Sequence, residues 1–110
     1  MRDAPVADGP RLAVGPGVIA EMVRLAAIEV PGVCRVGRGG PAWRRWTAGP
    51  AVRVETRGDV VDITVAIVAR PAQPLAALTR AVRIAVTKAV ERLLALELGS
   101  VTVVVDGVGV

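Results

Sequence analysis

The sequence predicts an α+β domain, a two-layer sandwich in which two amphipathic helices cover one face of a small mixed sheet. Three observations lead to this fold class. Two stretches show the 3.6-residue apolar period of helices, several short stretches are rich in valine, and a glycine turn joins two of the latter. Two helices can cover only one face of such a sheet, so its other face must meet water or another molecule. The expected order is strand-helix-strand-strand-strand-helix-strand.

The first elements precede residue 31. Residues 1–10 contain two prolines, one glycine and two aspartates, which is typical of a flexible tail. Residues 11–14 predict a short edge strand. A helix should begin at Gly15-Pro16, since proline suits the first helical turn, and run to about Glu29 or Val30, before Pro31. Its predicted apolar stripe consists of Val18, Met22, Leu25 and Ala26.

Valine-rich stretches predict three strands in the middle of the chain. They are Val33–Val36, Val52–Arg57 and Val60–Ala69. The last two should form a hairpin whose two-residue turn is Gly58-Asp59, because glycine tolerates the positive φ that such turns need. The predicted cross-strand pairs on the helix side are Thr56 with Val61, Val54 with Ile63, and Val52 with Val65. The opposite side would then carry Arg53, Glu55, Arg57, Asp62 and Thr64.

The last third of the chain predicts a long helix and a final strand. The helix should run from Leu75 to about Leu98, with Gly99 as its C-terminal cap, and the strand from Val101 to Val105. The helical stripe is Leu75, Leu78, Val82, Val86, Ala89, Leu93 and Leu96. The predicted core includes Leu78, Val82, Leu93, Val54, Ile63 and Val65. With no internal repeat, residues 11–110 are expected to form one domain.

The composition excludes the commonest catalytic and metal-binding side chains. The chain has no histidine, which removes Ser-His-Asp and Cys-His machinery and histidine-based zinc sites. The single cysteine, Cys34, cannot form an intrachain disulfide, which fits a reducing compartment. We interpret it as a small buried hydrophobe in a strand rather than as a redox-sensing thiol beside Arg35.

One pair of carboxylates faces across the predicted hairpin. Glu55 and Asp62 could in principle share acid–base work, but Arg53 and Arg57 flank them, and a solvated charge cluster is the simpler interpretation. We therefore expect no enzyme: no catalytic residue, cofactor, metal or small-molecule substrate.

The stretch GRGGPAWRRWTAGP, residues 37–50, holds both tryptophans of a chain that has no Phe and no Tyr. No acidic residue occurs between Val30 and Val54, where five arginines stand, whereas the rest of the chain has nine basic and ten acidic residues. The positive charge is thus local. Residues 38–49 are expected to form an exposed loop. The five arginines are Arg35, Arg38, Arg44, Arg45 and Arg53.

Several functions fit this loop. Trp43, Arg44, Arg45 and Trp46 suit the boundary between water and anionic lipid headgroups, and equally a groove on a partner protein. Alternatively the rings cover the sheet edge and the arginines are solvated. A nucleic-acid-binding domain is the alternative function, since arginine and tryptophan also contact phosphates and stack on bases.

A self-association surface is predicted on the sheet face away from the helices. Thr64, Ala66, Val68, Thr102 and Val104 should point there and be exposed. Exposed β-branched faces favour pairing with another subunit, although small antiparallel domains often leave such a face solvated.

Three segments together resemble the alkaline shock protein family of bacterial envelope-stress proteins. They are VIAEMVRLAAIEVPGVCRVG (18–37), VRVETRGDVVDITVAIV (52–68) and LLALELGSVTVVVDGV (93–108). The pattern departs from the family at Ala69-Arg70-Pro71, where an aromatic residue and glycine are usual, and the tryptophan loop is not shared. The resemblance implies a non-enzymatic, self-associating protein of the envelope stress response. It would be cytoplasmic and held at the inner face of the membrane by an anchored partner.

The N-terminus lacks the apolar stretch of a signal peptide, and no run of the sequence approaches the roughly 18 apolar residues that a membrane span needs. Both observations agree with the cytoplasmic location that the resemblance implies.

Overall fold

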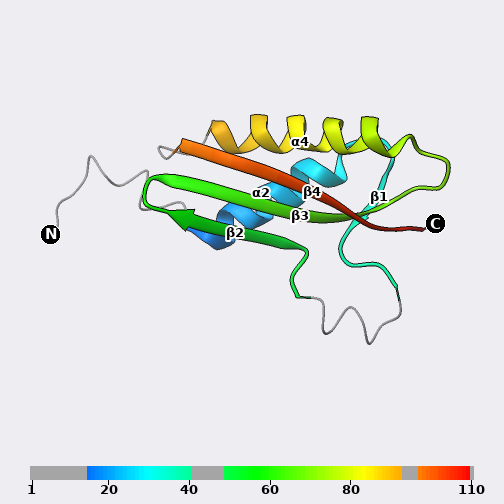
Figure 1. Cartoon of the computed structure of the whole chain (residues 1–110), viewed down its shortest axis with the longest axis horizontal. Helices are drawn as coiled ribbons and strands as arrows, with labels where there is room; N and C mark the ends of the chain where they lie inside the picture. The colour runs from blue at the N-terminus through cyan, green and yellow to red at the C-terminus, as the bar shows by residue number, and fades with distance from the viewer. Residues whose placement is uncertain (1–14, 41–48, 93–96, 110) are drawn as a thin grey trace, which may run out of the picture.

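The computed structural model describes residues 15–40, 49–92 and 97–109 and has the predicted α+β architecture, with a helical layer on a mixed sheet (Figure 1). The predicted tail (1–10) and edge strand (11–14) lie outside the described residues. The elements are α2 (Pro16–Ile28), β1 (Val33–Val36), β2 (Val52–Arg57), β3 (Val60–Ala69), α4 (Leu75–Glu91) and β4 (Glu97–Val108).

Strand β3 is the centre of the sheet. Strand β4 runs parallel to it along its whole length, and α4 makes the crossover between the two. On the other side of β3, β2 pairs antiparallel with residues 60–65 and β1 with residues 67–69, so β1 and β2 lie end to end. The hairpin turn and the three predicted cross-strand pairs of β2 and β3 are confirmed.

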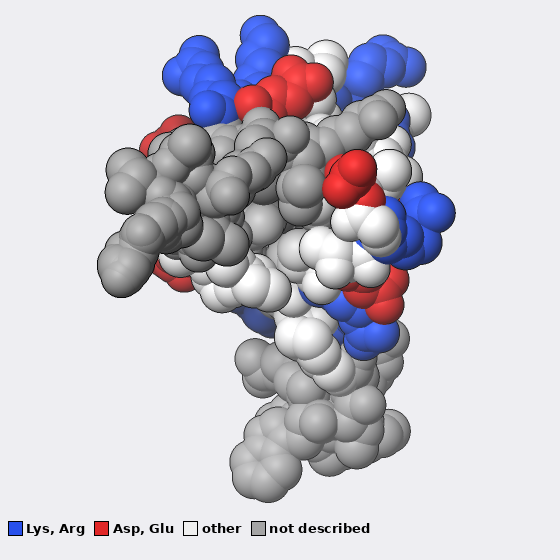
Figure 2. Space-filling model, turned by 90° about the vertical axis from the view of Figure 1, so that its left-hand side faces the viewer, with Lys and Arg blue, Asp and Glu red and all other residues white. Residues whose placement is uncertain are grey.

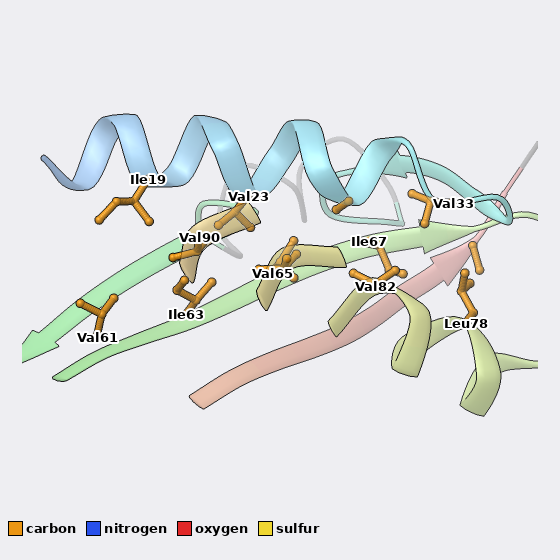
Figure 3. Packing of buried hydrophobic residues seen from close by; sticks show 13 residues of the cluster. Ile19, Val23, Val33, Val61, Ile63, Val65, Ile67, Leu78, Val82 and Val90 are labelled. Carbon is orange, nitrogen blue, oxygen red and sulfur yellow. The ribbon is translucent and has the colours of Figure 1, made fainter. Parts of the chain in front are cut away.

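A single aliphatic core joins both helices to one face of β3 (Figure 3). Alternate residues of a strand point to the same face, and the odd-numbered residues of β3 are all buried in this core. Both helices therefore cover that face, as predicted. The buried residues are Ile19, Val23 and Ala27 of α2, Val33 of β1, Val61, Ile63, Val65, Ile67 and Ala69 of β3, and Leu78, Val82, Val86 and Val90 of α4.

The predicted core is largely confirmed. Of its six members, Leu78, Val82, Ile63 and Val65 are buried, and Val54 is half-buried against the same cluster. Leu93 lies outside the described residues.

The predicted apolar stripe of α2 is wrong by about a quarter turn. Val18 and Leu25 are 48% and 46% exposed, whereas Ile19, Val23 and Ala27 face the sheet. Of the predicted stripe, Ala26 does pack against the core cluster. Helix α2 carries two neighbouring apolar stripes, and only one of them can face the sheet. Tertiary packing chose the second, which left Val18, Met22 and Leu25 as an additional stripe. We call these three residues the α2 stripe.

The predicted end of the long helix is also wrong. Helix α4 ends at Glu91, and β4 begins at Glu97 rather than at Val101. Gly99 therefore lies in a strand and is not a helix cap. Its lack of a side chain has a packing reason, because a Cβ there would lie against Val60 Cγ1 and 2.6 Å from Asp62 Oδ1. Parallel pairing with all of β3 outweighed the helical propensity of Glu97 and Leu98.

Helix α4 also contacts the main chain of β4, which among the described strands pairs only with β3. The Arg83 Nε donates a hydrogen bond to the main-chain oxygen of Val101 at 3.2 Å. A charged side chain across an open edge discourages pairing with another strand.

Candidate functional site on the outer face of the sheet

The outer face of the sheet is the one that points away from both helices. Strand register places Thr64 opposite Arg53 and Thr102, and Ala66 opposite Val104, on this face. It holds the residues that the sequence assigned to self-association, namely Thr64, Ala66, Val68 and Val104, together with most of the charged side chains of the sheet.

The exposure expected for Ala66 and Val68 is wrong. They are 1% and 3% exposed, although they lie outside the core cluster between the sheet and the helices. The main chain folds closely around them. The N–H of Gly37 donates to Ala66 O and the N–H of Ala66 donates to Ala51 O, while a Cβ on Gly109 would lie 3.1 Å from Val68 Cγ1. The self-association surface that remains exposed here is reduced to Thr102 and the half-buried Thr64 and Val104.

A charge ladder occupies the end of the outer face near the hairpin turn. Arg57 Nε donates to Asp62 Oδ2 at 2.7 Å, and the Ser100 hydroxyl donates to Asp62 Oδ1 at 2.9 Å. Glu55 lies opposite Asp62 in the register. Seen from this end of the molecule, Lys and Arg side chains lie beside Asp and Glu side chains over the described surface (Figure 2). Positive and negative charges are thus mixed at this end.

The hydrogen bond from Arg57, and next the one from Ser100, lower the pKa of the Asp62 carboxyl below its ordinary value. The same contact raises the pKa of Arg57. A general acid needs a raised carboxyl pKa. The shift of Asp62 has the opposite sign, as expected for a structural ion pair.

This shift predicts a pH dependence of stability. A carboxyl whose pKa is lower in the folded state stabilises the fold above its unfolded pKa, and that contribution is lost as the pH falls through the folded value. We expect Asp62→Asn to lower the melting temperature at pH 7 and to have little effect near pH 2. Thermal melts of both proteins from pH 7 to pH 2 measure this. If the difference in melting temperature between the two proteins stayed constant from pH 7 to pH 2, the stabilising role of the ionised Asp62 carboxylate would be contradicted.

The opposite end of the outer face carries three arginines, which we call the arginine patch: Arg35, Arg38 and Arg53. Arg35 Nη1 donates to Arg38 O at 3.1 Å, and Arg38 Nη2 donates to Pro50 O at 3.4 Å. Arg53 lies opposite Thr64. Its Nη2 reaches Gly49, where an added Cβ would lie 3.2 Å from it. These three were counted in the sequence, but only the fold shows that they share a face.

The loop that carries Trp43, Arg44, Arg45 and Trp46 lies outside the described residues at positions 41–48. Its described flanks differ from the expectation of a fully exposed loop. Gly40 and Gly49 are exposed, but Gly39 is buried, because its N–H donates to Asp106 Oδ2 at 2.9 Å and its Cα packs against the main chain of Asp106 and Gly107.

Cys34 is half-buried at an irregularity of the β1–β3 pairing, between Val33 and Arg35. Among the described residues, no group of three His, Cys, Asp or Glu side chains could hold a metal ion, and no described helix is long and apolar enough to cross a membrane.

Sequence reasoning missed an exposed apolar surface on the helices. The α2 stripe and Ile84 of α4, which is 49% exposed, lie away from the core. The charges of α2 itself are balanced, because Arg24 Nη2 forms a 2.5 Å ion pair with Glu21 Oε2. The sequence did indicate this exposed surface, because α2 carries two neighbouring apolar rows and only one of them can face the sheet.

Comparison with known proteins identifies the family. Residues 7–110 match the profile of the alkaline shock protein 23 family, which is described as having a cell envelope-related function. The chain belongs to this family. The resemblance found in the sequence is therefore confirmed over nearly the whole chain. The family's description concerns the cell envelope and specifies no reaction.

Solved structures of similar fold include C-terminal domains of MamM. A variant in a zinc form has a TM-score of 0.62 and 18% identity, and the match covers 86% of this chain and 87% of that domain. A variant in a manganese form has a TM-score of 0.59 and 20% identity, covering 83% and 96%. At this identity the likeness shows the fold alone. A comparison with curated proteins gave no match.

Proposed function

We propose that this family member is a non-enzymatic protein of the envelope stress response, which self-associates at the inner face of the cytoplasmic membrane and is held there by an anchored partner. The observation that carries the proposal is the family match over residues 7–110, with its cell envelope-related function. The arrangement of side chains supports a binding role. Of the carboxylate pair Glu55–Asp62, the first choice for acid–base chemistry, Asp62 accepts hydrogen bonds from Arg57 and Ser100, and Glu55 lies opposite it in the register.

The zinc and manganese of the MamM domain forms do not transfer to this chain. The likeness is of fold alone, and the described residues contain no cluster of metal-binding side chains. We therefore keep cofactors, metals and small-molecule substrates out of the proposal.

Self-association uses the α2 stripe in this proposal. Half-exposed apolar side chains at spacings of four and three residues suit helix pairing with a second copy. The neutral Glu21–Arg24 pair beside them keeps two copies of α2 from repelling each other. The outer face is the weaker candidate, since its most apolar members, Ala66 and Val68, are already buried within one chain.

Leu25→Glu is expected to convert the protein to a monomer at concentrations near 100 μM, because a second copy would have to bury an unpaired carboxylate. Light scattering measures the mass, and thermal melting checks that the fold is kept. Val104→Lys on the outer face is the matched control and should leave the mass unchanged. If Val104→Lys dissociates the protein while Leu25→Glu does not, the interface lies on the sheet.

The role at the membrane is tested by capture of the full chain from native membranes. We expect it to be recovered with a membrane-spanning partner, and the recovery to persist after nuclease treatment. Recovery only with nucleic acid would instead support the alternative, a small nucleic-acid-binding domain that uses the loop with Trp43, Arg44, Arg45 and Trp46.

A further inference from the structure

The arginines of the patch differ from Arg24 and Arg57 in having no described carboxylate partner, a property that they share with Arg83 of α4, which bonds to Val101 O. Arg24 and Arg57 are each paired with a carboxylate, Glu21 and Asp62 respectively. In the described part of the chain, no carboxylate pairs with Arg35, Arg38 or Arg53. Among the described residues, the side chains of Arg35 and Arg38 donate to main-chain oxygens, which carry no net charge to neutralise them.

The three arginines gather where two main-chain segments meet at this end of the sheet. Arg35 contacts the segment after β1, in which Arg38 lies, because its Nη1 donates to Arg38 O and would lie 3.1 Å from a Cβ on Gly37. Arg38 and Arg53 both reach residues 49–50, just before β2. Like charges gathered in this way repel one another, and an anion that bridges them relieves the repulsion.

Most of the hydrogen-bond donors of the patch remain available. A guanidinium group has five N–H donors, of which Arg35 and Arg38 each give one to the main chain. Arg38 Nε is buried and is therefore not among the available donors. The planar fork of arginine matches the oxygens of a phosphate group, which accepts two parallel hydrogen bonds.

We propose that the arginine patch binds the phosphate headgroups of an anionic lipid bilayer, so that the outer face of the sheet lies against the membrane. The inference goes beyond the proposed function, because it gives this chain an affinity for lipid that needs no anchored partner. The family's cell envelope-related function supports a lipid surface as the source of phosphate.

The surroundings of the patch favour a bilayer over nucleic acid. Val108 is 59% exposed and follows Gly107, which adjoins Gly39 at the same end of the sheet, so an apolar side chain accompanies the three charges.

The test is sedimentation of the purified full chain with vesicles. The vesicles contain phosphatidylglycerol and phosphatidylcholine, or phosphatidylcholine alone. We expect binding to the anionic vesicles only, weakening as salt is raised. Each arginine near such a surface strengthens binding about fivefold, so the triple variant R35Q/R38Q/R53Q should bind about a hundredfold more weakly.

The matched control removes the same charge from α4 and its C-cap, on the helical layer. R80Q/K88Q/R92Q should bind anionic vesicles almost as well as the unaltered chain. The side chain of Arg53 makes no hydrogen bond to a described residue, so Arg53→Gln should keep the melting temperature and still lose about fivefold in binding. This variant separates the role of the patch from any effect on folding.

Three outcomes would overturn the inference: no binding to anionic vesicles, an equal loss in both triple variants, or patch-dependent binding to single-stranded RNA that anionic vesicles do not displace. None of these outcomes affects the capture of an anchored partner from native membranes. The vesicle experiment can therefore fail while the proposed function holds, and the two failures are distinguishable.

Discussion

Replacing Val82 by Asp should prevent folding. Val82 lies in the middle of α4, is fully buried, and belongs to the cluster between α4 and β3. A carboxylate at this position would lose its hydration without gaining a partner. Together with the lost burial of the valine, we expect a cost of about 5 kcal/mol, which is comparable with the whole stability of a domain this size. Circular dichroism should show no cooperative melting transition.

Ile84→Asp is the matched control for this substitution. Ile84 lies two residues further along α4 and is half-exposed, so its carboxylate would remain hydrated. This variant should melt cooperatively, within a few degrees of the unaltered protein. A soluble and cooperatively melting Val82→Asp variant would show that α4 does not bury this side against the sheet.

Gly32→Ala should be the second most damaging of the substitutions considered. Gly32 has φ of +100°, and a Cβ there would lie 2.5 Å from Gln73 Oε1 and 3.1 Å from Leu78 Cδ1. Its main-chain oxygen also accepts the N–H of Arg70 at 2.8 Å, which ties the start of β1 to the end of β3. Backbone strain and crowding together should cost about 3 kcal/mol, or about 15 °C in melting temperature.

Gly17→Ala gives the opposite result at a glycine that has space. Gly17 lies in the first turn of α2, and a Cβ there would meet nothing within 4 Å. Alanine lowers the conformational entropy of the unfolded chain, so this variant should be more stable by about 0.5 kcal/mol. If Gly32→Ala melted at the same temperature as Gly17→Ala, the turn after α2 would have to tolerate a side chain that this structure excludes.

The sequence predicted the hairpin to the residue, because two local signals agreed. Glycine at position 58 defined the turn, and the alternation of Val61, Ile63 and Val65 defined which side faces inward. Where the local pattern favoured a different element from the one that forms, tertiary contacts determined the secondary structure. The residues before Val101 read as helix, yet β4 begins at Glu97 because β3 offers a parallel partner along its full length.

The candidate site was less predictable than the fold. Arg35, Arg38 and Arg53 are separated by up to eighteen positions, and nothing local places them on one face of a sheet. Ala66 and Val68 were expected to be exposed, because strand alternation placed them on the sheet face away from the helices. Alternation does not tell whether other parts of the chain cover that face, and both residues are buried. The segments at Gly37 and Ala51 are hydrogen-bonded to the main chain of Ala66, and Gly109 lies against Val68; loop paths of this kind leave no periodic signal in a sequence.

The central position of β3 has a consequence for synthesis on the ribosome. In the described sheet, β1 and β2 pair with β3 and not with each other, and β4 pairs with β3 as well. A nascent chain that ends before residue 60 therefore has strands without partners and an α2 without the sheet face it buries. Once β3 has emerged, α2, β1 and β2 can assemble on it, and the parallel strand β4 completes the sheet last, after the α4 crossover.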